Sequence, residues 1–397
     1  MIPRTDYLNK LTDFKDKKLI NVITGVRRCG KSTLLELFRD YLLKNGVMPE
    51  QIISINFEDA DYDFITDYKI LYSYIKDRLD KNRMTYVFLD EIQHVTEFER
   101  AVDSLYIKKN TDIYLTGSNA CLLSSEIATL LSGRYVEIQM LPLSFKEYLS
   151  SWNDKTDLNR KYKDYIRYSS FPYALELMEN KKLINDYLSG IYNTVILKDV
   201  VTRSKISDVM MLESLIRFMF DNIGNLCSIK KISDSMTSAG RKITTHTVES
   251  YISALLDSYI LYRAKRFDIK RKQYLKTGEK YYAVDIGLRY FLLGNKEIDI
   301  GHILENVVYL ELLRRSTEVY ICKVGPYEVD FIASNEDGVN YYQVSVSVRN
   351  KETLLKVLRP LEIIPDNYPK YLITLDEDPP ASYKGIKQIN LLDFLMS

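Results

Sequence analysis

The first 150 residues alternate between short apolar runs and longer amphipathic stretches. Five apolar runs have the length of buried strands, at residues 19–24, 51–57, 86–89, 113–115 and 136–140. Between them, apolar residues recur at helical spacing, as at Leu35, Phe38 and Leu42. Strands that alternate with helices in this way are typical of a parallel sheet covered by helices. We therefore predict an α/β unit over residues 1–150.

The middle of the chain changes to a helical pattern. Residues 151–205 are predicted to be helical, and no motif in them indicates a chemistry. Residues 206–294 contain three short amphipathic helices followed by two strand-like segments, which predicts a winged helix. The helices are expected at 212–222, 228–235 and 244–258, and the strands at 259–262 and 281–284.

The last hundred residues begin with an amphipathic helix, expected at 300–313. Three strand candidates follow it, at 319–323, 327–333 and 339–348, and a short helix is expected at 391–395. We therefore predict a further α/β domain over residues 295–397.

A glycine-rich motif joins the first predicted strand to the first predicted helix. Residues 25–32 read Gly-Val-Arg-Arg-Cys-Gly-Lys-Ser and fit the pattern G-x-x-x-x-G-K-[ST]. Glycines let backbone N–H groups turn toward an anion, and the helix N-terminus adds partial positive charge. Lys31 can then reach the β- and γ-phosphates, and Ser32 can offer its hydroxyl to a magnesium ion. The motif predicts a phosphate-binding loop.

Two carboxylates, Asp90 and Glu91, follow the predicted strand at 86–89. Ligands of open α/β sheets bind at the carboxyl ends of the strands, so we expect Asp90 beside the magnesium held by Ser32. Glu91 can orient or deprotonate the water that attacks the γ-phosphate. The predicted contacts of the nucleotide and its metal are Gly25, Val26, Arg27, Arg28, Cys29, Gly30, Lys31, Ser32, Thr33 and Asp90.

Two more segments are candidates for a part in hydrolysis. The strand that begins at Ile113 leads to Ser118 and Asn119, and either side chain can hydrogen-bond the γ-phosphate or the attacking water; the alternative is an ordinary polar turn. Arg134 precedes the strand at 136–140. Its guanidinium can stabilise transition-state charge or form a structural salt bridge, and the sequence favours neither role.

Composition excludes several classes of protein. A length of 397 residues suggests two to four domains, and 46% hydrophobic and 27% charged residues are ordinary for a globular protein. The net charge of +1 gives no overall attraction to nucleic acid or membranes. The four cysteines are far apart and the three histidines are unpaired, so neither zinc site nor disulfide framework is expected. Without a signal core or a run of about 18 apolar residues, we expect a cytoplasmic protein without a membrane partner.

The segment between the two predicted wing strands is locally basic. It holds eight basic residues against two acidic ones, Asp268 and Glu279. The basic residues are Arg263, Lys265, Arg266, Lys270, Arg271, Lys272, Lys276 and Lys280. A basic wing can contact DNA phosphates, and Arg266, Lys270, Arg271 and Lys272 are the candidates for this role. The alternative is a hairpin that is basic only for solubility.

Several of these segments together resemble the AAA+-type ATPase module of a large prokaryotic family in which a C-terminal domain of unknown function follows the ATPase. They are residues 25–32, 89–93, 116–119, 133–134 and 142–145. The resemblance runs nearly end to end, and the first 150 residues are the most diagnostic part. It implies that Lys31 and Ser32 contact nucleotide and magnesium, that Asp90 is the Walker B acid, that Glu91 is the catalytic acid and that Arg134 is a candidate arginine finger. It also implies a helical lid over residues 151–205.

The last domain resembles the PD-(D/E)XK restriction-endonuclease-like fold, with Glu305 on its helix and Asp330 on a strand. Active members of that fold carry E-x-K on the next strand, where this chain has Gln343-Val344-Ser345. An amide thus replaces a metal ligand and a hydroxyl replaces the ammonium group. We expect an inactive fold used for binding or dimerisation, and a relocated lysine such as Lys323 stays open.

The sequence therefore predicts an ATPase that hydrolyses ATP with Mg²⁺ and couples the nucleotide state to its winged-helix and nuclease-like domains. Two alternatives are a nucleotide-gated switch with little turnover and an ATP-dependent nuclease. A DNA partner, a protein partner and a homo-oligomer are all open. The sequence also leaves open whether Arg134 acts in its own subunit or on a neighbour.

Overall fold

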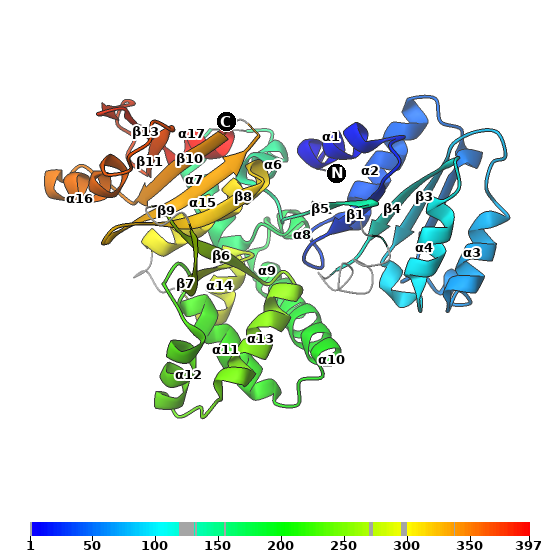
Figure 1. Cartoon of the computed structure of the whole chain (residues 1–397), viewed down its shortest axis with the longest axis horizontal. Coiled ribbons are helices and arrows are strands. Elements are labelled where there is room, and N and C mark those ends of the chain that lie inside the picture. Colours follow the sequence, from blue (N-terminus) through cyan, green and yellow to red (C-terminus); the bar gives the residue numbers. More distant parts are fainter. Residues whose placement is uncertain are drawn as a thin grey trace. The chain divides into compact units, whose positions relative to one another are not determined.

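A five-stranded parallel sheet forms the centre of the N-terminal unit in the computed structural model (Figure 1). Its strands are β1 (Ile20–Thr24), β2 (Ile52–Asn56), β3 (Thr85–Asp90), β4 (Thr111–Thr116) and β5 (Tyr135–Gln139). They lie in the order β2-β3-β4-β1-β5, so the predicted parallel sheet is confirmed. The structure describes residues 2–118, 131, 133–154, 156–269, 273–294, 300–336 and 338–397.

Helices cover both faces of this sheet. The helices of the unit are α1 (Thr5–Phe14), α2 (Lys31–Lys44), α3 (Tyr68–Lys76) and α4 (Phe98–Tyr106), with short 3₁₀ turns η1 (Pro49–Gln51), η2 (Ala60–Tyr62) and η3 (Ile92–His94). Alternate residues of β3 face opposite ways: Val87 packs in the core beneath α3 and α4, whereas Phe88 packs against Phe38 of α2. Burial on both faces explains why these strands are continuous apolar runs.

The second unit begins with helices. They are α6 (Phe145–Ser150), α7 (Leu158–Tyr168), α8 (Pro172–Glu176), α9 (Lys181–Ile191), the π-helical segment η5 (Tyr192–Asp199), α10 (Val200–Ser204), α11 (Val209–Asp221), α12 (Ile229–Ser238), α13 (Thr245–Asp257) and α14 (Ile286–Leu293). The order of α11, α12, α13 and a following hairpin is the one expected from the sequence. The winged helix itself stays a prediction.

An eight-stranded mixed sheet completes the second unit, in the order β12-β13-β11-β10-β9-β8-β6-β7. Its strands are β6 (Leu261–Asp268), β7 (Gln273–Ala283), β8 (Glu318–Val324), β9 (Tyr327–Asn335), β10 (Gly338–Ser345), β11 (Lys370–Thr374), β12 (Ser382–Tyr383) and β13 (Ile386–Asn390). The helices α15 (Ile300–Arg315), α16 (Lys351–Glu362) and α17 (Leu391–Met396) belong to the same region. Figure 1 shows β6 and β7 next to the orange and yellow strands of this sheet.

The pairing of β6 with β8 changes the domain picture drawn from the sequence. We expected the hairpin at 259–284 to end one domain and the segment 295–397 to form another. Arg266, Phe267 and Asp268 of β6 instead pair in parallel with β8, so hairpin and tail share one sheet. The compact units are residues 1–142 with 257–259, and residues 143–256 with 260–397. A pairing between strands distant in sequence leaves no local pattern, which is why the borders differ.

Among the described residues, no helix combines the length and the apolar character that a membrane crossing requires.

One buried acid in the N-terminal unit is incompletely satisfied. Asp112 at the start of β4 is 1% exposed. One of its carboxylate oxygens accepts hydrogen bonds from the Asp16 backbone N–H and the Tyr114 hydroxyl, both at 2.8 Å. Its other oxygen has no hydrogen-bond partner. Burial is the main reason why the pKa of Asp112 rises from 3.8 to about 6.

We predict that Asp112→Asn stabilises the N-terminal unit more at neutral than at acid pH. Because the folded-state pKa of Asp112 lies above the unfolded value, the wild type loses stability as pH rises from about 4 to about 6. The asparagine does not titrate, so the variant keeps this stability. Its free energy of unfolding, compared with that of the wild type, should therefore rise by about 1–2 kcal/mol across that range. Hydrogen exchange of β4 amides at pH 4.5 and 7.5 measures it, with the exposed Asp6→Asn as control. A pH-independent difference would contradict the prediction.

Candidate nucleotide-binding site

The phosphate-binding loop lies between the end of β1 and the start of α2, as the sequence predicts. Gly25 has φ 140°, and a Cβ there would lie 2.2 Å from the carbonyl oxygen of Met140. Only glycine fits this close approach. Gly30 has φ 102° and caps α2, and its carbonyl accepts the Leu34 N–H at 2.9 Å. The loop therefore ends on the first turn of a helix, where backbone N–H groups have no partner within the helix.

Lys31 is folded back into this loop. It is 4% exposed, and its Nζ donates to the carbonyls of Gly25 at 3.2 Å and Val26 at 3.4 Å. The same Nζ lies 3.7 Å from a carboxylate oxygen of Glu91. Carbonyls and a carboxylate thus hold the ammonium group at the place where phosphate oxygens are expected.

The other residues of the motif differ in accessibility. Val26 and Cys29 are buried, Thr33 is half-buried, and Arg28 and Ser32 are exposed. Arg27 forms an ion pair with Glu58. Ser32 hydrogen-bonds Asp90, so the hydroxyl and the carboxylate predicted to share a magnesium ion do meet.

Thr116 organises the two acids. It ends β4, the strand between β1 and β3. Its hydroxyl donates to Asp90 and accepts the backbone N–H of Glu91 at 2.9 Å. Glu91 has φ 53°, a left-handed conformation that a non-glycine residue adopts only where its surroundings hold it.

The roles of Ser118 and Asn119 at the γ-phosphate or the attacking water stay predictions. Ser118 does lie in the site and hydrogen-bonds Glu91. Asn119 lies outside the described residues. Thr116, which sequence reasoning missed, contacts both acids; its place as the last residue of the strand was the available signal.

The surroundings shift the pKa values of Asp90 and Glu91 in opposite directions. Burial raises the pKa of Asp90, against hydrogen bonds from Thr116 and Ser32. Burial also acts to raise the pKa of Glu91, but Lys31 and the hydrogen bond from Gln93 outweigh it and lower that pKa. Glu91 is therefore held as a carboxylate, the form that accepts a proton.

Arg134 lies at the other edge of the sheet. Its carbonyl accepts the N–H of Ile20 at 2.8 Å, at the start of β1, whereas the phosphate-binding loop follows the end of β1. Five residues of strand separate the two places, about 16 Å at 3.3 Å per residue. Its guanidinium pairs with Asp103 of α4 and lies over the Tyr106 ring. The salt bridge expected as the alternative role of Arg134 is present.

The predicted nuclease-like residues meet in the second unit. Gln343 donates to Asp330 at 2.8 Å, and Glu305 lies close to the same group. Sequence reasoning missed the residue at the centre, Lys280 of β7. Its Nζ lies 2.8 Å from Glu305, 2.9 Å from Glu328 and 4.0 Å from Asp330. The structure places Lys280 there rather than Lys323, the lysine considered from the sequence.

This cluster is close to charge balance. Burial acts to lower the pKa of Lys280, but Glu305, Asp330 and Glu328 outweigh it and raise that pKa. Burial and the charge of Glu305 raise the pKa of Asp330 to about 7. Arg266 adds a second cation, 3.5 Å from Glu328. Within the described part of the chain, no group of three or more His, Cys, Asp or Glu residues is arranged to hold a metal ion.

The candidate DNA contacts of the wing are only partly described. Lys270, Arg271 and Lys272 lie outside the described residues. Arg266 faces Glu328, Lys280 is buried, and Arg263 lies 3.8 Å from Glu279. Three cations of the basic segment are therefore paired within the second unit.

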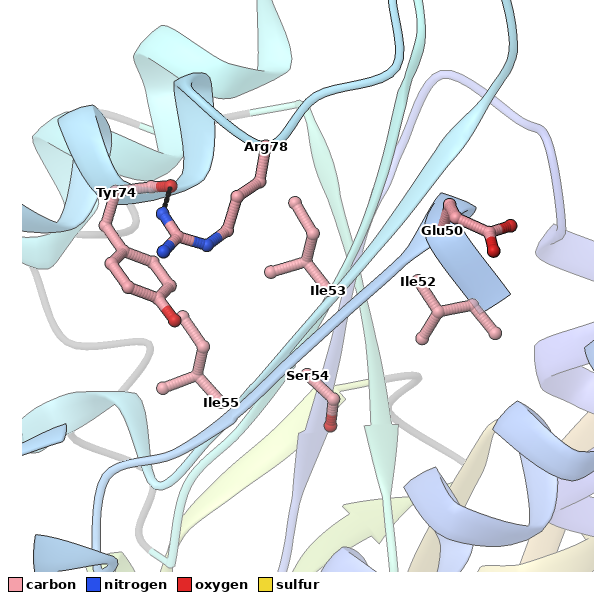
Figure 2. Close-up of a pocket in the computed structure, with 7 residues that line it drawn as sticks. All are labelled: Glu50, Ile52, Ile53, Ser54, Ile55, Tyr74 and Arg78. Atoms are coloured by element: carbon pink, nitrogen blue, oxygen red, sulfur yellow. Dashed lines mark hydrogen bonds between the residues drawn. The ribbon is translucent and has the colours of Figure 1, made fainter. Parts of the chain in front are cut away.

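A hollow elsewhere in the N-terminal unit is separate from this chemistry. Figure 2 shows it along β2, the edge strand of the five-stranded sheet. It is lined by Glu50, Ile52, Ile53, Ser54, Ile55, Tyr74 and Arg78. Arg78 closes one side, with its guanidinium 3.6 Å from the centre of the Tyr74 ring. No residue of the phosphate-binding loop contributes to it.

Comparisons with known proteins agree with the geometry of the loop and acids. Residues 17–149 match the family model described as an AAA domain, and residues 159–299 match a domain of unknown function (DUF8612). A Walker-type ATPase of Pyrococcus abyssi has a similar fold, with TM-score 0.52 and 15% identity, covering 74% of this chain and 96% of that one. The fold and the family model together define a P-loop ATPase module of the AAA class.

Two relatives are similar in sequence to this protein over most of its length. An uncharacterized protein of Haemophilus influenzae is 40% identical over 401 residues, which is 100% of this chain and 99% of the relative. An uncharacterized protein of Methanocaldococcus jannaschii is 32% identical over 336 residues, 80% of this chain and 73% of the relative. The chain belongs to the same family as the Haemophilus influenzae protein. A P-loop ATPase module implies nucleotide binding, usually with Mg²⁺.

We predict that Lys280→Met destabilises the second unit by about 3 kcal/mol or more, because it leaves buried carboxylates without their cation. Urea unfolding followed by the fluorescence of Trp152, the one tryptophan of the chain, measures this unit. The control is Lys323→Met, a lysine on the neighbouring β8. An equal effect of the two substitutions would show that the cluster does not depend on Lys280.

Proposed function

We propose that this protein hydrolyses ATP to ADP and phosphate at the site formed by Lys31, Ser32, Asp90 and Glu91. One observation carries the proposal: the phosphate-binding loop, the two acids and the Thr116 hydroxyl contact one another at the carboxyl ends of the parallel strands β1, β3 and β4. The AAA family model and the fold of the Pyrococcus ATPase support it.

The present contacts suggest how a nucleotide is accommodated. Lys31 is held by two carbonyls and Glu91, all weaker partners for an ammonium group than a triphosphate. When Lys31 turns to the phosphates, Glu91 loses its neighbouring cation and is free to accept a hydrogen bond from water. Thr116 and Ser118 keep the two acids in place during this exchange.

Ser32 and Asp90 are the residues that fit a magnesium ion, since a hydroxyl and a carboxylate are oxygen donors of the kind that Mg²⁺ prefers. Bound there with the triphosphate, the ion would neutralise charge on the phosphate oxygens. The carboxylate of Glu91 then orients the attacking water and takes its proton.

We predict that Lys31→Ala and Glu91→Gln separate binding from turnover. Lys31→Ala should abolish measurable Mg-ATP affinity in calorimetry because the phosphates lose their cation. Glu91→Gln should keep affinity but lower phosphate release by about 10²–10⁴-fold, since the amide accepts no proton. Lys44→Ala, at the far end of α2, is the control. Parent-rate hydrolysis by Glu91→Gln would show that Glu91 is not the base.

The same phosphate-release assay separates the hydrolase from a nucleotide-gated switch, which binds ATP but gives less than one turnover. We expect no nuclease activity, because the amide of Gln343 stands where active members have an acidic metal ligand, and this amide donates to Asp330. Plasmid incubated with the protein, ATP and Mg²⁺ or Mn²⁺ should stay intact.

Any role of Arg134 as an arginine finger requires a second copy of the chain, since its own phosphate-binding loop lies at the opposite edge of the sheet. The guanidinium would also have to leave Asp103. We propose this role only for an assembled oligomer.

A second candidate function is binding of duplex DNA through α12 and α13. Four exposed cations lie on this segment, Lys230 and Lys231 in the first turn of α12, and Arg241 and Lys242 in the turn between α12 and α13. None of the four has an acidic side chain within salt-bridge distance in the described part of the chain. Thr244 caps α13 by accepting the Thr247 N–H at 3.1 Å. Unpaired cations beside a helix–turn–helix suit phosphate contacts better than the paired cations of the hairpin.

We predict that Arg241→Gln with Lys242→Gln weakens DNA binding and lowers the slope of log affinity against log salt by about 1–2, since each phosphate contact contributes about 0.9. Fluorescence anisotropy with a duplex oligonucleotide measures it. The matched control neutralises Lys270 and Arg271. A larger loss of DNA affinity in the control would indicate that the predicted wing, and not the turn between α12 and α13, contacts the DNA.

A further inference from the structure

Arg4, just before α1, reaches the phosphate-binding loop from behind. It is 3% exposed, although arginine is seldom fully buried. One terminal nitrogen donates to the Cys29 carbonyl at 2.9 Å and the other to the Leu141 carbonyl at 2.6 Å. Its guanidinium also lies 4.9 Å from the centre of the Tyr7 ring. A buried cation thus bridges the loop and the chain just after β5.

The bond to Cys29 acts on the orientation of the next N–H group. A trans peptide is planar, so its C=O and the following N–H point in opposite directions. Holding the Cys29 carbonyl toward Arg4 therefore directs the Gly30 N–H away from Arg4. Gly30 has φ 102° and no side chain to hold it, so this peptide can otherwise rotate at small cost.

Arg4 and Tyr7 both contact Leu141, but through different groups. Arg4 has φ 45°, a left-handed backbone that turns the chain into α1. Tyr7, one turn along α1, accepts the Leu141 N–H at 3.0 Å. Both polar groups of Leu141 are therefore bound by the first turns of the chain, but only Arg4 also reaches the loop, through its bond to the Cys29 carbonyl.

The charge of Arg4 also reaches the loop. Burial raises the pKa of the Cys29 thiol, and the positive charges of Lys31 and Arg4 act against that rise. The guanidinium therefore contributes to the electrostatic potential at the loop, where it favours an anion.

We propose that Arg4 is a positioning residue for the nucleotide site, which presets the phosphate-binding loop by holding the Cys29–Gly30 peptide. The inference rests on the proposed nucleotide binding, and it adds to the site a residue that precedes the first strand. Its contribution concerns phosphate binding and not the water or its proton.

Three variants test the proposal in the full-length protein. Arg4→Met removes both bonds and the charge. Arg4→Lys keeps the charge but can satisfy only one carbonyl well. Tyr7→Phe is the matched control, since it removes a buried bond from α1 to Leu141 but leaves the bond to Cys29. The dissociation constants of Mg-ADP and Mg-ATP are measured by calorimetry, and the melting temperature is measured without nucleotide.

Arg4→Met should raise the dissociation constants of both nucleotides by about tenfold to a hundredfold, the range expected when two charge-assisted hydrogen bonds are lost. Arg4→Lys should lie between it and the wild type, and Tyr7→Phe should stay within about threefold of the wild type. Without nucleotide, amides of residues 29–32 should exchange faster in Arg4→Lys than in Tyr7→Phe. This difference is the readout that general destabilisation of α1 would not produce.

The outcomes separate the two claims. If the wild type binds neither nucleotide, the proposed function fails. If the wild type binds and Arg4→Met binds equally well, or if Tyr7→Phe loses as much affinity as Arg4→Met, the role of Arg4 fails. Should Arg4→Met not fold, Arg4→Lys is judged by the same criteria, and wild-type affinity with wild-type exchange overturns the proposal.

Discussion

The structure of the N-terminal unit depends on a buried ammonium group that must always have oxygen partners. Lys31 has almost no access to water, so the cost of its charge is met by two loop carbonyls and Glu91. These contacts link the loop after β1 to the acid after β3, and Ser32 stays exposed. A phosphate-bearing ligand offers stronger partners, and its arrival changes the surroundings of Glu91 at the same moment. In the proposed mechanism, nucleotide binding and the readiness of Glu91 to act as a base are thus linked through Lys31.

The second unit contains a comparable lysine with the opposite outcome. Lys280 is also buried among carboxylates, but its partners come from α15 and β9 and surround it closely. Arg266 and the raised pKa of Asp330 complete the balance of charge. The cluster is therefore close to charge balance. The contrast shows why matching residue types alone do not define a catalytic centre. Both lysines are buried, but Lys31 is held partly by loop carbonyls at 3.2 and 3.4 Å, whereas Lys280 lies 2.8 and 2.9 Å from the carboxylates of Glu305 and Glu328.

The sequence was informative where a function depends on neighbouring residues. The parallel strands, the loop at 25–32 and the acids after β3 all have local patterns, and the structure places them as expected. Contacts between distant segments left no such pattern. Lys280 meets Glu305 only because β6 pairs with β8, and Arg4 meets Cys29 only because α1 packs beside α2. The sequence left the role of Arg134 open for a related reason, since its chain position says nothing about which edge of the sheet it occupies.

The cluster around Lys280 bears on how such chains are inherited. The recognisable sequence module ends at residue 299, yet Lys280 within it depends on Glu305, Glu328 and Asp330 beyond it. A recombination event that exchanged the C-terminal part would leave the buried Lys280 without its carboxylate partners and remove β8, the strand that pairs with β6. Chimaeras joined at this border should therefore be rare among viable descendants, and the two segments are expected to travel together through evolution even though their sequences read as separate modules.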